Sequence, residues 1–108
     1  MAKILLLGLD HSVADELGDV LRQLGQSVRI APKREGKVDA ADADLIFAGS
    51  GDLRRALAVS PKRPVIVTSR VPEVKAWLNA LEDGAADYCG APFEATQVRW
   101  LLNSALAA

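Results

Sequence analysis

Lys3-Ile4-Leu5-Leu6-Leu7-Gly8 is the stretch that decides the fold, because it is a continuous apolar run ended by a glycine. A strand with one face in water alternates polar and apolar residues, whereas an uninterrupted run of this length is typical of a strand buried on both faces. Such strands occur in parallel sheets that helices cover on both sides. We therefore expect helices to separate this strand from further strands along the chain.

The rest of the sequence alternates strand patterns with helical ones. Short apolar runs predict strands over residues 27–31, 45–48, 64–68 and 85–89. Between them apolar residues recur at helical spacing, and glycines follow two of the helical patterns as natural helix ends. A further short helix is expected near residues 39–42.

Side-chain directions follow from the same patterns. In the helix whose first turn is expected to contain Pro72, the spacing predicts an inward-facing stripe of Val74, Leu78 and Leu81. In the last helix the predicted inward-facing residues are Val98, Leu101, Leu102 and Ala105. The candidate helix N-caps are Asp10, Ser12 and Asp52.

Strands that alternate with helices indicate an α/β fold. We expect residues 1–108 to form a single domain, with a five-stranded parallel sheet, right-handed crossovers and helices on both faces. Functional groups in such sheets gather where the strands end at their carboxyl side. These positions are residues 8–10, 49–52, 69–70 and 90–91.

Composition narrows the function classes. The 108 residues include 13 basic and 14 acidic side chains, a formal charge of −1, which argues against direct binding of nucleic acid. We expect no membrane association, because no apolar run approaches the length of a membrane span and the N-terminal run is too short for a signal peptide. The single cysteine, Cys89, cannot form an internal disulfide, so a reducing cytoplasm is the expected location.

A second stretch carries a family resemblance. Leu81-Glu82-Asp83-Gly84-Ala85-Ala86-Asp87-Tyr88, followed by Ala91-Pro92-Phe93, resembles a segment of the receiver domain of two-component response regulators (the CheY-like family). In that family a Gly-Ala turn leads into the fifth strand and a Lys-Pro-Phe run follows it. Residues 3–7, 44–48 and 64–69 are similar to the first, third and fourth receiver strands. The resemblance covers nearly the whole chain and implies the flavodoxin-like strand order 2-1-3-4-5.

The resemblance also assigns the positions of the phosphorylation site, and these have lost their chemistry. Receivers carry phosphate on an aspartate after the third strand, where an acidic pair holds Mg²⁺ and a lysine contacts the phosphoryl group. The acceptor position falls on Gly49, the acidic pair on Gly8 and Leu9, and the lysine on Ala91. Because glycine has no nucleophile, the resemblance implies a degenerate pseudo-receiver that is not an enzyme and has no metal or other cofactor.

Two positions of the receiver switch are retained, as the hydroxyl of Ser69 and the aromatic ring of Tyr88. Trp77 and Trp100 are predicted to lie beside Tyr88 on the face formed by the fourth helix, the fifth strand and the last helix. In receivers this face contacts partners or a second copy, and aromatic side chains are favoured interface anchors. Alternatively, both tryptophans lie flat over the rim of the core.

Other polar residues near the strand ends have two interpretations. Asp10 and Asp52 could form a relocated metal or phosphate site with Ser50 or Ser69, or they could simply cap helices. The turn over residues 49–51 could present backbone N–H groups to an anion, although it lacks the lysine of a P-loop.

Neither the single histidine nor the single cysteine is expected to form a functional site. His11 is expected to be solvated, because no second histidine or cysteine stands beside it to complete a metal site. Cys89 is expected to pack as a small apolar group in its strand rather than to react.

The sequence therefore leads to one main hypothesis and one alternative. The main hypothesis is a noncatalytic, phosphorylation-independent signalling module that contacts a protein partner, or itself, through Trp77, Tyr88 and Trp100. The alternative is a flavodoxin-like domain that binds a small ligand or anion with its strand-end loops.

Overall fold

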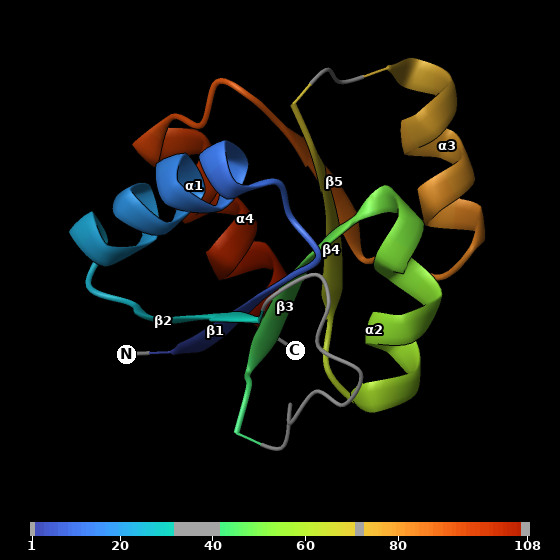
Figure 1. Cartoon of the computed structure of the whole chain (residues 1–108), viewed down its shortest axis with the longest axis horizontal. Coiled ribbons are helices and arrows are strands. Elements are labelled where there is room, and N and C mark those ends of the chain that lie inside the picture. The colour runs from blue at the N-terminus through green and yellow to red at the C-terminus, as the bar shows by residue number, and fades with distance from the viewer. Residues whose placement is uncertain (1, 32–41, 71–72, 107–108) are drawn as a thin grey trace.

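Five short strands follow one another along the chain in the order that the sequence predicts, and the structure describes a helix after every strand except β2. The computed structural model describes residues 2–31, 42–70 and 73–106 (Figure 1). Its elements in chain order are β1 (Lys3–Leu7), α1 (His11–Gln23), β2 (Ser27–Ala31), β3 (Leu45–Gly49), the 3₁₀ helix η1 (Ser50–Asp52), α2 (Leu53–Val59), β4 (Val65–Ser69), α3 (Val74–Glu82), β5 (Asp87–Gly90) and α4 (Ala95–Leu106).

All strand pairs are parallel, and the sheet has the order β2-β1-β3-β4-β5. The predicted fold class and strand order are therefore confirmed. β5 begins at Asp87 rather than at the predicted Ala85. The amide of Ala85 instead donates to the carbonyl of Ala80, 3.0 Å away, in a bond that closes the preceding helix.

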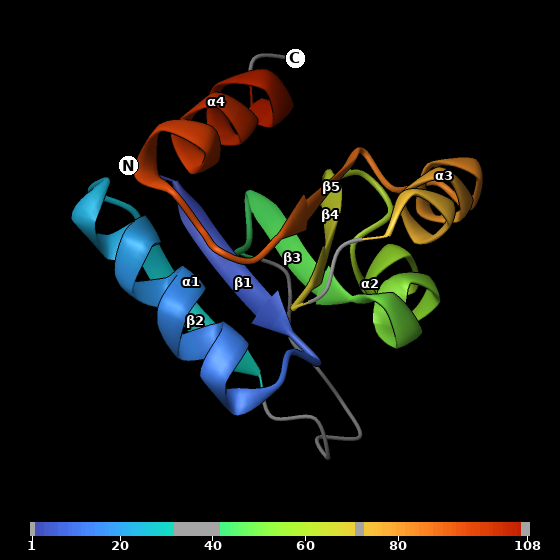
Figure 2. The same ribbon diagram turned by 90° about the horizontal axis from the view of Figure 1, so that it is seen from above.

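Helices cover both faces of the sheet. Figure 2 shows α1 and α4 on one side and α2 and α3 on the other. The side chains of β1 divide between two cores: Ile4 and Leu6 pack with residues of α1 and α4, and Leu5 and Leu7 pack with residues of α2 and α3. All four are at most 2% exposed, which explains why this strand has no polar face.

The predicted inward stripe of α3 is wrong. Val74, Leu78 and Leu81 are 68%, 52% and 37% exposed, and Ala80 is the buried residue of this helix. α3 carries two apolar stripes, one of large residues and one of alanines. The alanine stripe lies inward because its small side chains allow the helix to lie close to its neighbours. The large residues therefore remain at the surface.

Two of the predicted N-cap residues occupy N-cap positions, but their side chains do not make the expected capping hydrogen bonds. Asp10 and Asp52 occupy the N-cap positions of α1 and α2, yet neither side chain makes a capping hydrogen bond. Ser12 lies inside the first turn of α1 and is not a cap. The helix expected near residues 39–42 falls mainly on 39–41, outside the described residues. None of the described helices has the length and apolar composition that crossing a bilayer requires.

Candidate functional site

The carboxyl ends of β1, β3 and β4 surround a pocket of about 370 Å³, called here the strand-end pocket. It forms because these neighbouring parallel strands all end at the same edge of the sheet. Its lining residues come from the strand ends and the loops after them: Gly8, Leu9, Asp10, Val13, Gly49, Gly51, Asp52, Thr68, Ser69 and Arg70. The structure therefore brings the residues that the resemblance assigns to the acceptor and the acidic pair together with Ser69.

A side chain at Gly8 would displace the Asp52 carboxylate, and one at Gly49 would press on backbone. Gly8 has φ +70°, and a Cβ built on it would lie 2.1 Å from Oδ2 of Asp52. A Cβ on Gly49 would lie 2.8 Å from the carbonyl oxygen of Gly8 and 3.7 Å from Oδ2 of Asp52. Real Cβ atoms essentially never approach other atoms closer than 3.0 Å. The carboxylate of Asp52 thus lies across the two glycines, in the space that longer side chains would need.

The relocated-site residues meet only in part. Asp10, Asp52 and Ser69 line the strand-end pocket, whereas the side chain of Ser50 lies outside the described part of the chain. Oδ1 of Asp52 lies 3.6 Å from Nη1 of Arg55, so this carboxylate has a cationic partner within the protein. Among the described residues, no group of three His, Cys, Asp or Glu side chains is placed to hold a metal ion.

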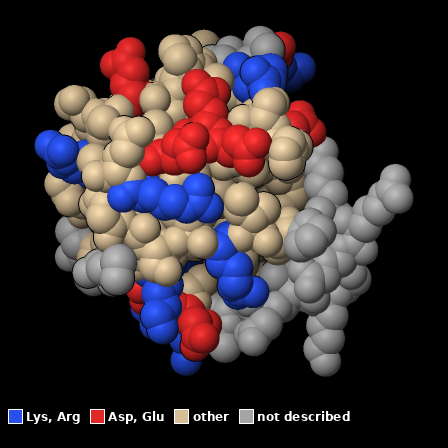
Figure 3. Space-filling model, turned by 60° about the vertical axis from the view of Figure 1, so that its left-hand side comes forward, with Lys and Arg blue, Asp and Glu red and all other residues tan. Residues whose placement is uncertain are grey.

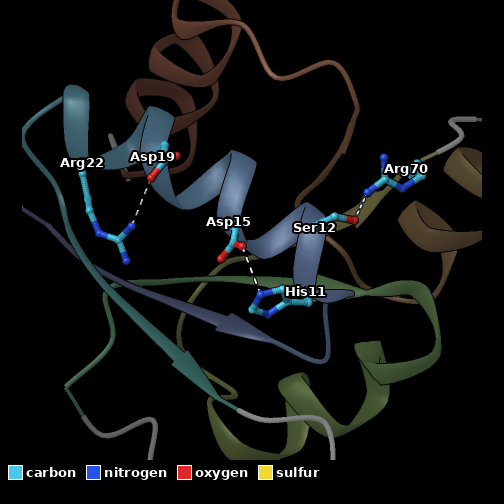
Figure 4. A network of polar contacts seen from close by, with 6 residues as sticks. All are labelled: His11, Ser12, Asp15, Asp19, Arg22 and Arg70. Carbon is cyan, nitrogen blue, oxygen red and sulfur yellow. Dashed lines mark hydrogen bonds and ion pairs between the residues drawn. The ribbon is translucent and has the colours of Figure 1, made fainter.

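Arg70 is a pocket residue in the predicted strand-end stretch 69–70, but no specific role for it was predicted from the sequence. It follows Ser69 at the end of β4 and lines the strand-end pocket, and its guanidinium donates to the hydroxyl of Ser12 on α1 (Figure 4). The sequence signal for its role was a cationic residue directly after a strand end, whereas the resemblance placed the expected cation at residue 91. The arginine links the β4 end to the start of α1.

His11 has no ligand role in this arrangement. Its side chain is 94% exposed, and Nε2 lies 3.2 Å from Oδ2 of Asp15, one helical turn away (Figure 4). The expected solvated position is therefore confirmed.

The lysine position of the resemblance falls outside the strand-end pocket. Ala91 lies beyond β5, and its amide donates to the carbonyl of Ser69 at 3.1 Å. Its side chain lines a second and larger cavity, described next.

This second cavity is an open groove of about 550 Å³ formed by α3, β5 and α4, and we call it the aromatic groove. It contains all three aromatic residues singled out from the sequence. Its lining residues are Glu73, Val74, Trp77, Asp87, Tyr88, Gly90, Ala91, Pro92, Glu94, Gln97, Trp100 and Leu101. Trp77 and Trp100 are 43% and 62% exposed, so both present apolar surface to solvent along the groove, and Tyr88 is half-buried.

Cys89 is fully buried among the side chains that α1 and α4 press against the sheet. Burial, and secondarily the negative charge of Asp87, raises the pKa of its thiol from 9.0 to about 12. The thiolate that would react is therefore scarce at neutral pH, as the sequence reading expected.

Surface charge is mixed rather than segregated on the face shown in Figure 3, where acidic and basic side chains lie beside one another. This agrees with the formal charge of −1 for the whole chain.

Comparison with known proteins identifies the fold. No protein-family model matches the sequence, and no curated protein does. Solved structures of response regulators do match. NtrX from Brucella abortus in complex with ATP has a TM-score of 0.77 and 22% identity over 98% of this chain, which spans only 27% of the NtrX chain.

Two further solved structures are similar over more of their own length. A response regulator receiver domain protein from Clostridium thermocellum has a TM-score of 0.75 and 17% identity, covering 99% of this chain and 95% of that one. A response regulator protein from Burkholderia pseudomallei, solved with a phosphorylated aspartic acid, a calcium ion and citrate, has a TM-score of 0.73 and 18% identity, covering 96% and 69%. The chain thus has the receiver fold that the sequence resemblance implied.

Proposed function

We propose that residues 1–108 form a single receiver-like domain that signals without being phosphorylated and without catalysing a reaction. It acts by binding a protein partner, or a second copy of itself, through the aromatic groove. In this proposal Gly8, Leu9, Gly49 and Ala91 are the vestiges of a phosphorylation site, and Ser69 and Tyr88 are the retained switch positions.

The observation that carries the proposal is the filled space at Gly8 and Gly49. An aspartate at residue 49 would need a Cβ only 2.8 Å from the carbonyl oxygen of Gly8. An acidic residue at position 8 would need a Cβ 2.1 Å from the Asp52 carboxylate, at a φ of +70°. Because both positions are closed together, no single substitution restores the acceptor and its Mg²⁺ ligands.

The aromatic groove is the described surface best suited to binding a partner protein. Trp77 and Trp100 expose large apolar surfaces on two different helices, and Tyr88 joins them from β5. Aromatic residues that line a concave surface are the usual anchors of protein interfaces.

The first experiment tests whether the chain accepts a phosphoryl group. The purified chain is incubated with Mg²⁺ and acetyl phosphate, and its mass and tryptophan emission are recorded. We expect no phosphoryl adduct and no Mg²⁺-dependent change in emission. A stable acyl phosphate on any aspartate, Asp10 and Asp52 included, would overturn the phosphorylation-independent function.

The second experiment tests whether the aromatic groove mediates association. Trp77→Ala with Trp100→Ala should weaken self-association in sedimentation, or capture of partners from the source cell, while the unfolding transition stays cooperative. The matched control is Ile30→Ala with Leu106→Ala, since these residues are 43% and 37% exposed and do not line the groove. Equal association of both double variants and the unaltered chain would refute the role of the groove.

A second candidate function, binding of a small anion in the strand-end pocket, is favoured by Arg70. Its guanidinium and the Ser69 hydroxyl line the same cavity, but the Asp52 carboxylate there opposes a negative ligand. Titration with inorganic phosphate decides this candidate. Saturable binding that Arg70→Ala abolishes would support it over the leading proposal.

A further inference from the structure

The aromatic groove has a chemistry suited to cations. Trp77 from α3 and Trp100 from α4 are both partly exposed along it, and Tyr88 adds a third ring from β5. The faces of aromatic rings attract positively charged groups, most strongly for tryptophan. An Arg or Lys side chain that entered this groove would therefore meet favourable surfaces from three separate elements.

Carboxylates add to this preference at the edge of the groove. Glu73, Asp87 and Glu94 line it, one from each of the segments that bound it. None of its described lining residues is Lys, Arg or His. Arg99, although next to Trp100 in sequence, lines a separate cavity with Gln26 and Leu106. The groove thus combines an apolar centre with charges of a single sign.

The apolar surface of α3 continues past the groove. Leu78 and Leu81 follow Val74 at helical spacing and are 52% and 37% exposed, but they do not line the groove. A small molecule held in the groove would leave both leucines in water. A helical chain segment laid along α3 would cover them and could still place a side chain between the aromatic rings.

We infer that the aromatic groove binds a basic amphipathic segment of a different protein, with an Arg or Lys of that segment between Trp77 and Trp100. This inference rests on the proposed function and specifies the partner. A symmetric pair of this chain is disfavoured, because a two-fold interface would bring the carboxylates of one groove toward those of the other. A basic segment gains attraction from the same carboxylates.

The test uses three synthetic peptides that share one amphipathic helical pattern of leucines and differ only in their polar positions, which are all Arg, all Gln or all Glu. Binding is followed by the emission of Trp77 and Trp100, the two tryptophans of the chain. We expect the Arg peptide to bind at least about tenfold more tightly than the Gln peptide at low salt, and the preference to shrink as salt is raised.

Charge-removing variants test whether the carboxylates of the groove cause the preference for the Arg peptide. Glu73→Gln with Glu94→Gln should bring the two affinities within about threefold, because the carboxylates at the edge no longer attract the cationic peptide. Glu16→Gln with Asp19→Asn removes the same number of charges from exposed positions of α1, which lies outside the groove and α3, and should leave the preference intact.

Several results would overturn the inference. Equal binding of the Arg and Gln peptides, or no binding of any peptide, removes the cationic partner. The same emission change with free arginine at equal concentration indicates a small-cation pocket instead. Dimerisation at low salt that Trp100→Ala abolishes indicates a second copy as the occupant. In each case the proposed function is judged separately, by the association of the Trp77→Ala, Trp100→Ala variant.

Discussion

Substituting Gly8 with alanine tests whether the Asp52 carboxylate really occupies the space over the lost acidic position. The new Cβ would lie 2.1 Å from Oδ2 and 2.5 Å from Cγ of Asp52. If Asp52 is first shortened to alanine, the nearest of these contacts that remains is its own Cβ at 3.1 Å. The effects of Gly8→Ala and Asp52→Ala on stability should therefore depend strongly on each other.

The size of this dependence follows from two separate terms. A φ of +70° is unfavourable for alanine by about 1–2 kcal/mol whatever surrounds it. The overlap with Asp52 adds about 1–3 kcal/mol, typical of an overpacked site. Asp52→Ala alone should lower the free energy of unfolding by only about 0–1 kcal/mol, because its partly exposed ion pair with Arg55 is 3.6 Å long. We expect a coupling energy of about 1–3 kcal/mol between the two positions.

Urea unfolding of the four proteins in this double-mutant cycle measures the coupling, with far-UV circular dichroism as the readout. Gly25→Ala is the control, since Gly25 also has a positive φ (+82°) and a Cβ there meets no atom within 4 Å outside its two chain neighbours, so it should not couple to Asp52→Ala. A coupling energy for Gly8 below about 0.5 kcal/mol would refute the reasoning, because sites without contact reach that value. The filled-space argument for the proposed function would then fail as well.

Three other perturbations follow from the same structure. Gly49→Asp should lower the free energy of unfolding by about 1–3 kcal/mol and still yield no phosphoryl adduct by mass spectrometry, because its Cβ would press on the Gly8 carbonyl. Burial raises the pKa of the Cys89 thiol from 9.0 to about 12, so above pH 9.0 only the unfolded chain releases this proton. The free energy of unfolding should therefore fall by up to about 1.4 kcal/mol per pH unit, a slope that Cys89→Ala removes and urea titrations at several pH values measure. Leu78→Gln should change stability by less than about 0.5 kcal/mol, whereas Leu17→Ala should lower it by about 2–5 kcal/mol, and thermal unfolding distinguishes the two.

The sheet was predictable because its strands are buried on both faces. Continuous apolar runs such as residues 3–7 and 45–48 leave few structural alternatives, and their spacing leaves room for one crossover after another. α3 was less predictable because both of its stripes are apolar. Periodicity shows that a helix has an apolar face, but it does not show which of two such faces meets the sheet. The burial of Ala80 in the same core cluster as Leu53 of α2 and Val67 of β4 decides this, and that burial is a tertiary property.

The place of the strand-end pocket was predictable from the sequence, whereas the position of the Asp52 side chain within it was not. The resemblance located Gly8 and Gly49 at strand ends that the structure brings together. The position of the Asp52 carboxylate across them depends on the turn through η1 and on the positive φ of Gly8, and a linear pattern encodes neither. Cap statistics predicted that the Asp52 side chain would accept a backbone hydrogen bond at the start of α2, whereas its carboxylate lies over Gly8 and beside the Arg55 guanidinium.

If Ser69 and Tyr88 keep two arrangements, as the proposed function supposes, a source of free energy other than phosphorylation has to select between them. The two residues lie on adjacent strands, where Val67 pairs with Tyr88 and Ser69 pairs with Gly90. A partner seated against Tyr88 in the aromatic groove therefore acts on the same ladder that carries Ser69. Such a partner shifts the equilibrium only by the difference between its affinities for the two arrangements, and equal affinities shift nothing. We therefore expect the aromatic groove to be where the signal enters this domain as well as where it leaves.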